Sequence, residues 1–440
     1  MKVLKFGGTS VGSPQRIKNV AELVTKRGKN IIVLSAMSGT TNSLLEICDY
    51  LYKKNAEGAK ETINNLEAKY FAHAAELFED DKYRASALEV IKERFNYVRS
   101  LVKDIFTVFE EKEVVGQGEL ISTAMMTFYL QSKGVKAALL PALDFMKIDK
   151  NNEPDAKYIK SHLEEILDQN KDADIYITQG FICRNAYGEV DNLQRGGSDY
   201  TASLIGAAIN AEEIEIWTDI DGMHNNDPRF VEKTQPVEEL HFDEAAELAY
   251  FGAKILHPTC ILPAKLNNIP VRLLNTMEPS AKGTLIHNTP AGHKIKAVAA
   301  KDNITAIKIK SGRMLLAYGF LRKVFEIFES YKTPIDMIAT SEVGVSVSID
   351  NERNLDNIVN DLKKFGTVTV DKDMVIICVV GDLEWSNTGF ESEVLTAMKD
   401  IPVRMISYGG SNYNISLLVS KADKVKALNA LSEHIFNKQN

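Results

Sequence analysis

Short β-branched runs separated by amphipathic segments fill residues 1–292, and this alternation constrains the fold more than any other feature of the chain. The pattern indicates an α/β fold whose strands are buried on both faces of a largely parallel sheet. The charged, turn-poor segment 42–112 is predicted to be a helical excursion over that sheet. The expected strands are 3–6, 31–35, 137–140, 175–179, 214–218 and 271–274.

Pro- and Gly-containing turns at 279–283 and 289–292 predict a domain boundary near residue 292. The pattern after it is strand, helix, two strands, helix and strand, which is typical of a ferredoxin-like module. A second pass from residue 374 lacks its sixth strand, and we expect strand 295–300 to supply it. The modules are therefore predicted to be nested, although βαββα units are common and the likeness can be coincidence. The predicted domains are 1–292, then 303–373, then 293–302 with 374–440.

Charge and cysteine content exclude several classes of protein. The chain has 52 Lys and Arg against 60 Asp and Glu, a net charge of −8, and a nucleic-acid or anionic-membrane binder needs a basic face. No apolar stretch approaches the roughly 18–20 residues of a membrane span. The four scattered cysteines fit reduced thiols, and glycines interrupt the N-terminus where a signal peptide would be apolar. We therefore expect a cytoplasmic protein that binds neither nucleic acid nor membranes.

Two turns that follow strands carry small and polar residues. Lys5 stands at a strand end before Gly7-Gly8, and Ser13-Pro14 then starts a helix, an arrangement that suits phosphate binding. A plain structural Gly-Gly turn is the alternative. The hydroxyl-rich segment 35–42 either binds a carboxylate or phosphate or only caps the next helix.

The segment 194–201 is the strongest local signal. It joins Arg195 to Gly196-Gly197 and Ser198-Asp199 at the start of a small-residue helix. Two glycines allow a close backbone approach, and Arg offers a planar fork for a carboxylate or phosphate.

Three further charged residues follow strands or flank helices. Asp219 ends a strand, where ligands commonly bind in open α/β sheets. Glu119 in a first helical turn either complements the helix dipole or, in a pocket, binds an ammonium group. Lys254 near a helix end is either a dipole partner or a second phosphate cation.

Together these motifs resemble those of the aspartate kinases of the amino-acid kinase family. The matching motifs are KFGGTS, SxxSGTTN, GE(L)xS, RGGSDYTA, WTDxxG, DPR and FGAKxLHP, in the family's order over residues 5–258. The tail resembles the family's paired ACT regulatory modules, and the spacing is closest to the monofunctional, lysine-sensitive branch. We therefore expect no fused homoserine dehydrogenase after the second module. The resemblance implies transfer of the γ-phosphoryl group of ATP to the β-carboxylate of L-aspartate, with Mg²⁺ held mainly by ATP oxygens and no protein metal site.

The resemblance also implies residue roles. A carboxylate nucleophile is already ionised at neutral pH, so catalysis needs positioning and charge neutralisation and no general base. Where the family often has Tyr, two residues after the glycine of WTDxxG, this chain has His224. The implied catalytic residues are Lys5, Asp219 and Lys254; the ATP-binding residues are Lys5, Phe6, Gly7, Gly8, Thr218, Asp219, His224, Arg229 and Lys254; the aspartate-binding residues are Ser35, Thr41, Glu119, Arg195, Gly196, Gly197, Ser198 and Asp199.

An amino-acid effector, L-lysine first, is expected to bind the first ACT module, and ACT pairing implies a homodimer or a dimer of dimers. Lysine-sensitive relatives often have polar residues where Leu316 and Ala317 stand here, so threonine stays an alternative. The implied effector residues are Met314, Tyr318, Gly319, Phe320, Leu321, Asp336, Thr340, Ser341 and Glu342.

Two competing interpretations remain at this point. Another carboxylate kinase, for acetylglutamate or glutamate, has the same fold, but Glu119 disfavours an N-acetylated substrate that has no ammonium group. An inactive amino-acid sensor would not need the cations that face the phosphates.

Overall fold

The computed structural model describes residues 1–103, 105–193, 196–252, 256–289, 292, 294–311 and 318–437. The chain forms two compact units: Met1–Gly222 with Leu256–Asn288, and Met223–Ile255 with Thr289–Asn440. The sequence shows no boundary signal that would assign Met223–Ile255 to the second unit. The predicted domain bounds stay predictions. No described helix is long and apolar enough to cross a membrane.

A mostly parallel sheet forms the centre of the first unit, as the short apolar runs predict. Within this unit its strands lie in the order β3-β4-β2-β1-β7-β9-β10; the neighbours from β3 to β9 are parallel, and β10 is antiparallel to β9. Every residue of β2 and β4 is buried, which explains why these runs show no polar alternation. The strands are β1 (Lys2–Phe6), β2 (Asn30–Leu34), β3 (Ala137–Leu139), β4 (Ile175–Gln179), β7 (Ile214–Thr218), β9 (Val271–Asn275) and β10 (Thr284–His287).

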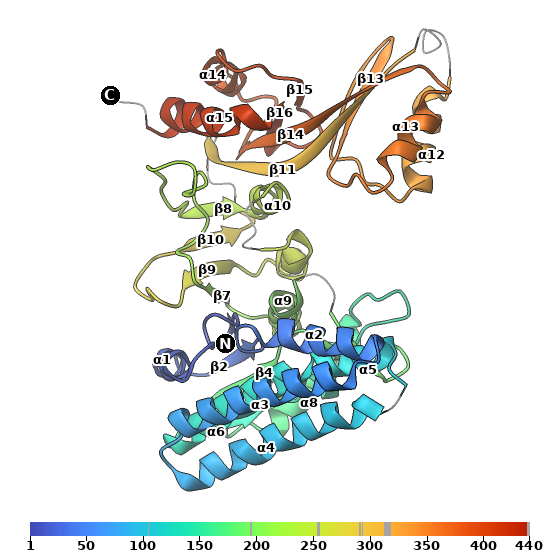
Figure 1. Cartoon of the computed structure of the whole chain (residues 1–440). Helices are drawn as coiled ribbons and strands as arrows, with labels where there is room; N and C mark the ends of the chain where they lie inside the picture. The colour runs from blue at the N-terminus through green and yellow to red at the C-terminus, as the bar shows by residue number, and fades with distance from the viewer. Residues whose placement is uncertain are drawn as a thin grey trace. The chain divides into compact units, whose positions relative to one another are not determined.

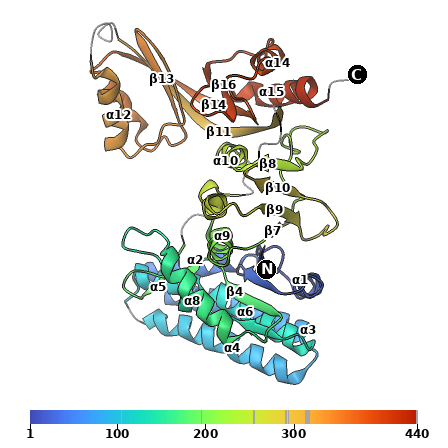
Figure 2. The ribbon, with the colours of Figure 1, turned by 180° about the vertical axis from the view of Figure 1, so that it is seen from behind.

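Helices cover both faces of this sheet. Helix α6 contacts β2, β3 and β4, whereas α9 contacts β1, β2 and β7. The long helices α3 and α4 lie side by side as the predicted helical excursion (Figures 1 and 2). A short antiparallel pair, β5 (Ile182–Arg184) with β6 (Val190–Asn192), was not predicted. The helices are α1 (Pro14–Thr25), α2 (Thr40–Tyr52), α3 (Ala56–Leu77), α4 (Asp81–Ser100), α5 (Val108–Val115), α6 (Gln117–Ser132), α7 (Ala142–Phe145), α8 (Ala156–Gln169), α9 (Gly197–Ile209) and α11 (Leu262–Leu266).

The second unit contains an antiparallel sheet with the order β12-β13-β11-β14-β16-β15. Two long strands run through both modules, β11 (Ile295–Lys310) and β14 (Thr367–Gly381). The sequence pattern predicts each of these long strands as two shorter ones. The predicted break in β11 lies where its register on β14 is irregular, near Lys301 and Ile304. The other elements are β8 (Glu239–His241), α10 (Phe242–Tyr250), α12 (Phe320–Ser330), β12 (Met337–Ser341), β13 (Gly344–Ile349), α13 (Leu355–Leu362), α14 (Phe390–Ala397), β15 (Met405–Ser407), β16 (Asn414–Ser420) and α15 (Lys424–Leu431).

The predicted nesting of the two modules is confirmed by strand pairing. The start of β11 pairs with the end of β14, where Ala297 lies opposite Val380, and β16 pairs on the other side of β14. The end of β11 instead pairs with β13 and with the start of β14. Each module has its own apolar core, centred on Val324, Phe328 and Ile358 in the first and on Val394, Leu417 and Leu428 in the second.

Candidate active site

Four parallel strands of the first unit end at one edge of the sheet. The register places Phe6 beside Leu34 on one side and beside Trp217 on the other, and Leu34 lies beside Gln179. The residues that follow these four strands therefore meet at this edge: Gly7-Gly8, Ser35, Gly180, and Asp219 after Thr218. Ligands of open α/β sheets bind at such carboxyl edges.

Glycine is required at position 8 by a close backbone contact. A Cβ atom there would lie 2.7 Å from the carbonyl oxygen of Ala36. The Ser38 amide donates to the Gly8 carbonyl at 3.1 Å, which holds this turn against the one after β2. The two polar turns predicted from sequence are thus packed together. Phe6, by contrast, is buried and stacks on Trp217, so only its backbone faces the turn.

Lys5 is paired across the sheet with the first turn of α9. Its Nζ lies 2.7 Å from Oδ1 of Asp199, and both side chains are largely buried. A Cβ on Gly7 would come within 3.6 Å of the Lys5 Nζ, so the missing side chain leaves that ammonium group open to a ligand on the glycine turn. A positioned cation beside a glycine turn is a cradle for phosphate oxygens.

Ser35 and Ser198 join the end of β2 to the start of α9. Their hydroxyl oxygens lie 2.9 Å apart, with the Ser35 hydroxyl donating. Helix α9 begins after Gly196, whose φ of +78° is in the left-handed region that favours glycine. A Cβ at Gly180 would lie 2.4 Å from the Ser198 Cβ, so only glycine lets β4 approach α9 this closely. Hydroxyls at a helix N-terminus suit a carboxylate.

Glu119 is a buried carboxylate in the first turn of α6. Its Oε1 accepts a hydrogen bond of 3.1 Å from the Ala36 amide. Its Oε2 is buried and has no hydrogen-bond partner among the described residues. Burial raises the pKa of Glu119 to about 7, and the Ala36 amide opposes this only in part. A buried carboxylate oxygen without a partner has the charge and the free acceptor capacity to pair with an ammonium group.

Other predicted residues occupy nearby positions with weaker structural constraints. Thr41 lies in the first turn of α2 and is half-buried. Its neighbour Thr40 is buried and hydrogen-bonded to the Tyr70 hydroxyl at 2.8 Å. Asp219 is exposed, and the Thr218 hydroxyl donates to its Oδ1 at 3.1 Å. The local structure leaves both Thr41 and Asp219 accessible to a ligand.

Some predicted residues cannot be placed with this set. His224 and Arg229 belong to the second unit, where His224 contacts Thr234 at 2.9 Å and Arg229 grips Asp227 in a bidentate pair. The predicted residues Arg195, Lys254 and Met314 lie outside the described residues. All five keep their predicted roles as predictions.

The predicted effector residues divide into two kinds. Tyr318 is exposed just before α12, Leu321 is exposed in the first turn of α12, and the segment 340–342 is exposed at the end of β12. Gly319 caps α12 with a φ of +81°, and Phe320 is buried. Asp336 differs, because its side chain is only 1% exposed and already pairs with Lys301 at 2.6 Å.

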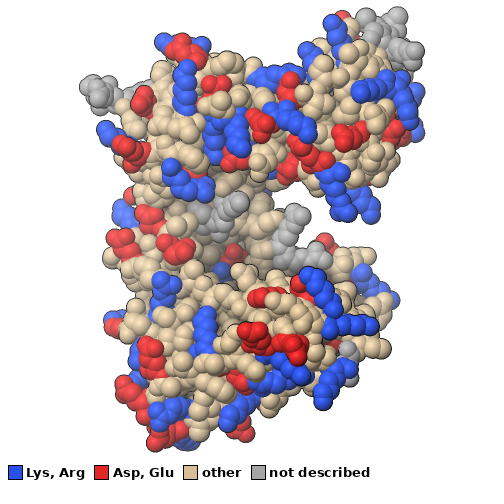
Figure 3. Space-filling model, viewed as in Figure 1, with Lys and Arg blue, Asp and Glu red and all other residues tan. Residues whose placement is uncertain are grey.

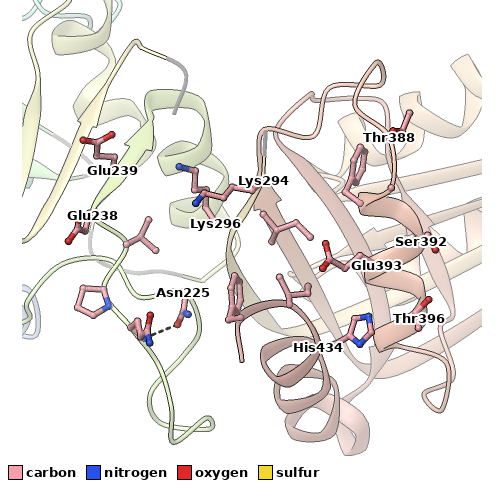
Figure 4. A pocket seen from close by; sticks show the side chains of 18 residues that line it. Asn225, Glu238, Glu239, Lys294, Lys296, Thr388, Ser392, Glu393, Thr396 and His434 are labelled. Atoms are coloured by element: carbon pink, nitrogen blue, oxygen red, sulfur yellow. Dashed lines mark hydrogen bonds between the residues drawn. The ribbon is translucent and has the colours of Figure 1, made fainter. Parts of the chain in front are cut away.

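A separate groove of about 1130 Å³ lies within the second unit (Figure 4). Lys294 and Lys296 stand on one side of it, and Glu393 and Ser392 of α14 on the other. Its described lining includes no residue predicted for catalysis or effector binding.

Comparison with known proteins places the chain in a family. The model of the amino acid kinase family matches residues 1–275, and an ACT domain model matches residues 377–435. The chain belongs to the amino acid kinase family. Within it, aspartokinase 1 of Arabidopsis thaliana, a chloroplastic protein, is 34% identical over 99% of this chain and 80% of its own length. Lysine-sensitive aspartokinase 3 of Escherichia coli is 31% identical over 99% of both chains.

A solved structure agrees with the assignment to the aspartokinases. The crystal structure of E. coli aspartokinase III in complex with aspartate and ADP matches with a TM-score of 0.81 and 30% identity, over 99% of this chain and 100% of that one. The predicted family, the α/β fold with ACT modules and the assignment as an aspartate-directed kinase are confirmed.

Sequence patterns alone miss several features of this aspartokinase site. Ser122 is one turn beyond Glu119 and donates to the Ser35 carbonyl at 2.9 Å, which fixes α6 on β2. Gly180 leaves room for Ser198. A glycine directly after a predicted strand is a sequence signal for such a close approach, and it could have identified Gly180. The pairing of Lys5 with Asp199 had no signal, because the two residues are far apart in sequence.

Proposed function

We propose that this chain transfers the γ-phosphoryl group of ATP to the β-carboxylate of L-aspartate and gives 4-phospho-L-aspartate. The observation that carries the proposal is Glu119, a buried carboxylate with one unpartnered oxygen, on the same sheet edge as the lysine and glycines of a phosphate cradle. An amino-acid substrate with a free ammonium group and an acidic side chain has the complementary charges.

The residues at the phosphate end act by positioning and by neutralising charge. ATP supplies the phosphoryl group, and Mg²⁺ enters with it on the phosphate oxygens. Gly7 and Gly8 let the backbone approach those oxygens, and Lys5 neutralises charge that develops during transfer. Asp199 holds the Lys5 ammonium group at 2.7 Å, so the cation is oriented before the nucleotide binds. We assign Thr218 and Asp219, with Lys254, His224 and Arg229, to the nucleotide.

The residues at the substrate end read an α-amino acid. Glu119 takes the ammonium group, and Arg195 takes the α-carboxylate in a bidentate grip. The N-terminus of α9, from Gly196 to Ser198, with Ser35 and Thr41 positions the carboxylates. The β-carboxylate has a free pKa near 4, so it attacks as the anion and needs no base.

The proposal includes feedback inhibition by an amino acid, L-lysine first, at the first ACT module. The lysine-sensitive aspartokinase 3 of Escherichia coli, which is 31% identical over 99% of both chains, supports this choice. We also propose that ACT modules pair two copies of the chain. Leu321 and Phe325 are both about 40% exposed, four residues apart on α12, and an apolar stripe of this kind is suited to a partner surface.

We further propose a cytoplasmic location and no nucleic-acid partner. Cys48, Cys183 and Cys378 are buried free thiols, which supports a reducing compartment. On the face shown in Figure 3, Lys and Arg side chains are interspersed with Asp and Glu. Mixed charge of this kind is unlike the basic face of a nucleic-acid binder.

The test is release of ADP by the purified chain with ATP, Mg²⁺ and either L-aspartate or L-glutamate, each with and without lysine and threonine. We expect ADP release that depends on aspartate and falls when lysine is added. ADP release with glutamate but not aspartate, or release that needs neither, would contradict the proposal. If threonine alone inhibits, the kinase assignment stands and the choice of effector is wrong.

A further inference from the structure

A polar cluster in the second unit surrounds Asp336 at the start of β12. Lys301 of β11 donates to Oδ1 of Asp336 at 2.6 Å and lies 3.0 Å from Oδ2 of Asp350. The Tyr250 hydroxyl, at the end of α10, donates to the same Oδ1 at 3.0 Å. The Lys301 ammonium group also lies over the Tyr250 ring, 4.4 Å from its centre. Three separate segments are therefore held by one aspartate.

The cluster is short of one positive charge. Asp336 and Asp350 carry two negative charges, Lys301 carries one positive charge, and Tyr250 is neutral. Both donors use Oδ1 of Asp336, while Oδ2 is buried without a hydrogen-bond partner among the described residues. Burial raises the pKa of the Asp336 carboxyl, which Lys301 opposes and Asp350 reinforces. Leaving a buried charged oxygen unpaired is costly, so an added cation would be favoured there.

We propose that Lys301 sets the affinity and charge preference of the first ACT module for its effector, by occupying one oxygen of Asp336 and competing with an effector's ammonium group for the negative charge of the cluster. The proposal rests on the proposed function in one respect, that a basic amino acid binds near Asp336. Lys301 is an internal counter-ion, so the wild-type module binds a cationic effector more weakly than its two aspartates would allow.

Two substitutions shift the charge of the cluster in opposite directions. Lys301→Met removes the positive charge and keeps an unbranched apolar chain, so the net charge goes from −1 to −2. Asp350→Asn removes one negative charge from a side chain that is 37% exposed, so the net charge becomes zero. Electrostatics then predicts tighter lysine binding in the first variant and weaker binding in the second, each by about tenfold. A merely structural role for the cluster predicts weaker binding in both.

The experiment is calorimetric titration of the full chain with L-lysine, and with L-norleucine as a probe that has the same carbon chain and α-ammonium group but lacks the side-chain ammonium group. Lys308→Met is the matched control, because Lys308 is exposed on the same strand β11. We expect the two cluster variants to change lysine affinity in opposite directions, and the control and norleucine binding to stay unchanged. Thermal unfolding checks that each variant is folded.

Several results would overturn the proposal. One is unchanged or weaker lysine binding by a folded Lys301→Met variant; another is a parallel change in norleucine affinity. If the wild type binds lysine too weakly to measure, the proposal requires binding to appear in Lys301→Met, and its absence there refutes it. If Lys301→Met does not fold, unchanged or tighter lysine binding by Asp350→Asn refutes it. Aspartate-dependent ADP release without lysine is unaffected by these outcomes, so failure of the kinase assignment is detected separately.

Discussion

Glu119 in the first unit and Asp336 in the second are both buried carboxylates with one oxygen that lacks a hydrogen-bond partner among the described residues. Their surroundings differ. Glu119 receives one backbone amide, and the hydrogen bonds and ion pairs described for it include no cation. Asp336 receives Lys301 at 2.6 Å and the Tyr250 hydroxyl. The Glu119 carboxylate has no described cation beside it, whereas Lys301 offsets one of the two negative charges of Asp336 and Asp350.

The two lysine–aspartate pairs make the same contrast. Lys5 lies 2.7 Å from Asp199 beside a glycine turn that leaves the ammonium group accessible, and Lys301 lies 2.6 Å from Asp336 between packed segments. Similar pair geometry therefore serves different ends. In the proposed mechanism the first pair orients a cation for incoming phosphates, and the second pair weakens the binding of a cationic effector.

Lys5→Ala is expected to have the largest effect. Removing a charge-stabilising group at a transferring phosphoryl should lower kcat on the order of 10²–10³-fold while the fold stays intact. Steady-state kinetics by ADP release measures it, with the exposed Lys26→Ala as control. Near-normal kcat would contradict the role of Lys5. Lys301→Met, in contrast, should leave the uninhibited kcat unchanged.

Glu119→Gln is expected to raise the KM for aspartate about 10–100-fold with little change in the KM for ATP, because a hydrogen bond to a charged group contributes about 1.5–3 kcal/mol. With its pKa raised to about 7, wild-type Glu119 is increasingly protonated below neutral pH and attracts ammonium less. kcat/KM for aspartate should therefore fall as pH drops below 7, and this dependence should flatten in the variant. Equal changes in both KM values would refute the ammonium role.

The same substitution should stabilise the protein at alkaline pH. The folded-state pKa of Glu119 is raised, so its protonated form favours folding below pH 4.5, and that contribution is lost as pH rises towards 7. At pH 8 the wild type holds a buried charge that Gln does not carry. We expect Glu119→Gln to raise the free energy of unfolding by about 1–3 kcal/mol at pH 8. Denaturant titrations at pH 5 and pH 8 test this, and a lower stability at pH 8 would contradict it.

Gly180→Ala is expected to have a smaller effect. The added Cβ would meet Ser198 at 2.4 Å, so α9 or the serine must shift and the contact between Ser35 and Ser198 must lengthen. We expect the KM for aspartate to rise several-fold, about 1 kcal/mol, with kcat less affected. Gly410→Ala is the control, because an added Cβ there meets nothing within 4 Å and the glycine is not among those with a positive φ. An unchanged KM in Gly180→Ala would remove Ser198 from the substrate site.

Local sequence signals predict the frame of the molecule well. Strands β4 and β7 have the predicted limits, because both are short β-branched runs buried on both sides. The strand pair β5–β6 was missed, since three-residue strands carry too little pattern. The sequence predicted two separate strands in place of each of the long strands β11 and β14. Polar residues near the middle of each strand resemble a turn, although β11 and β14 pair on both sides of that point.

The site was predictable in its residue types but not in its pairings. Lys5, Glu119 and Ser198 were named from their motifs, yet only the fold reveals that one oxygen of Glu119 is unpartnered. The contact of Lys301 with Asp336 joins two strands and depends on register, which sequence does not specify. Tertiary packing supplies the part of the chemistry that decides which charges remain free for ligands.

Trapping the product tests the central claim most directly. Acyl phosphates react with hydroxylamine, so incubation with ATP, Mg²⁺, L-aspartate and hydroxylamine should convert 4-phospho-L-aspartate into the β-hydroxamate of aspartate. We predict one hydroxamate for each ADP released, formed with aspartate and not with glutamate, and lost in Lys5→Ala. ADP release without hydroxamate, or hydroxamate formed from glutamate in place of aspartate, would contradict the assignment.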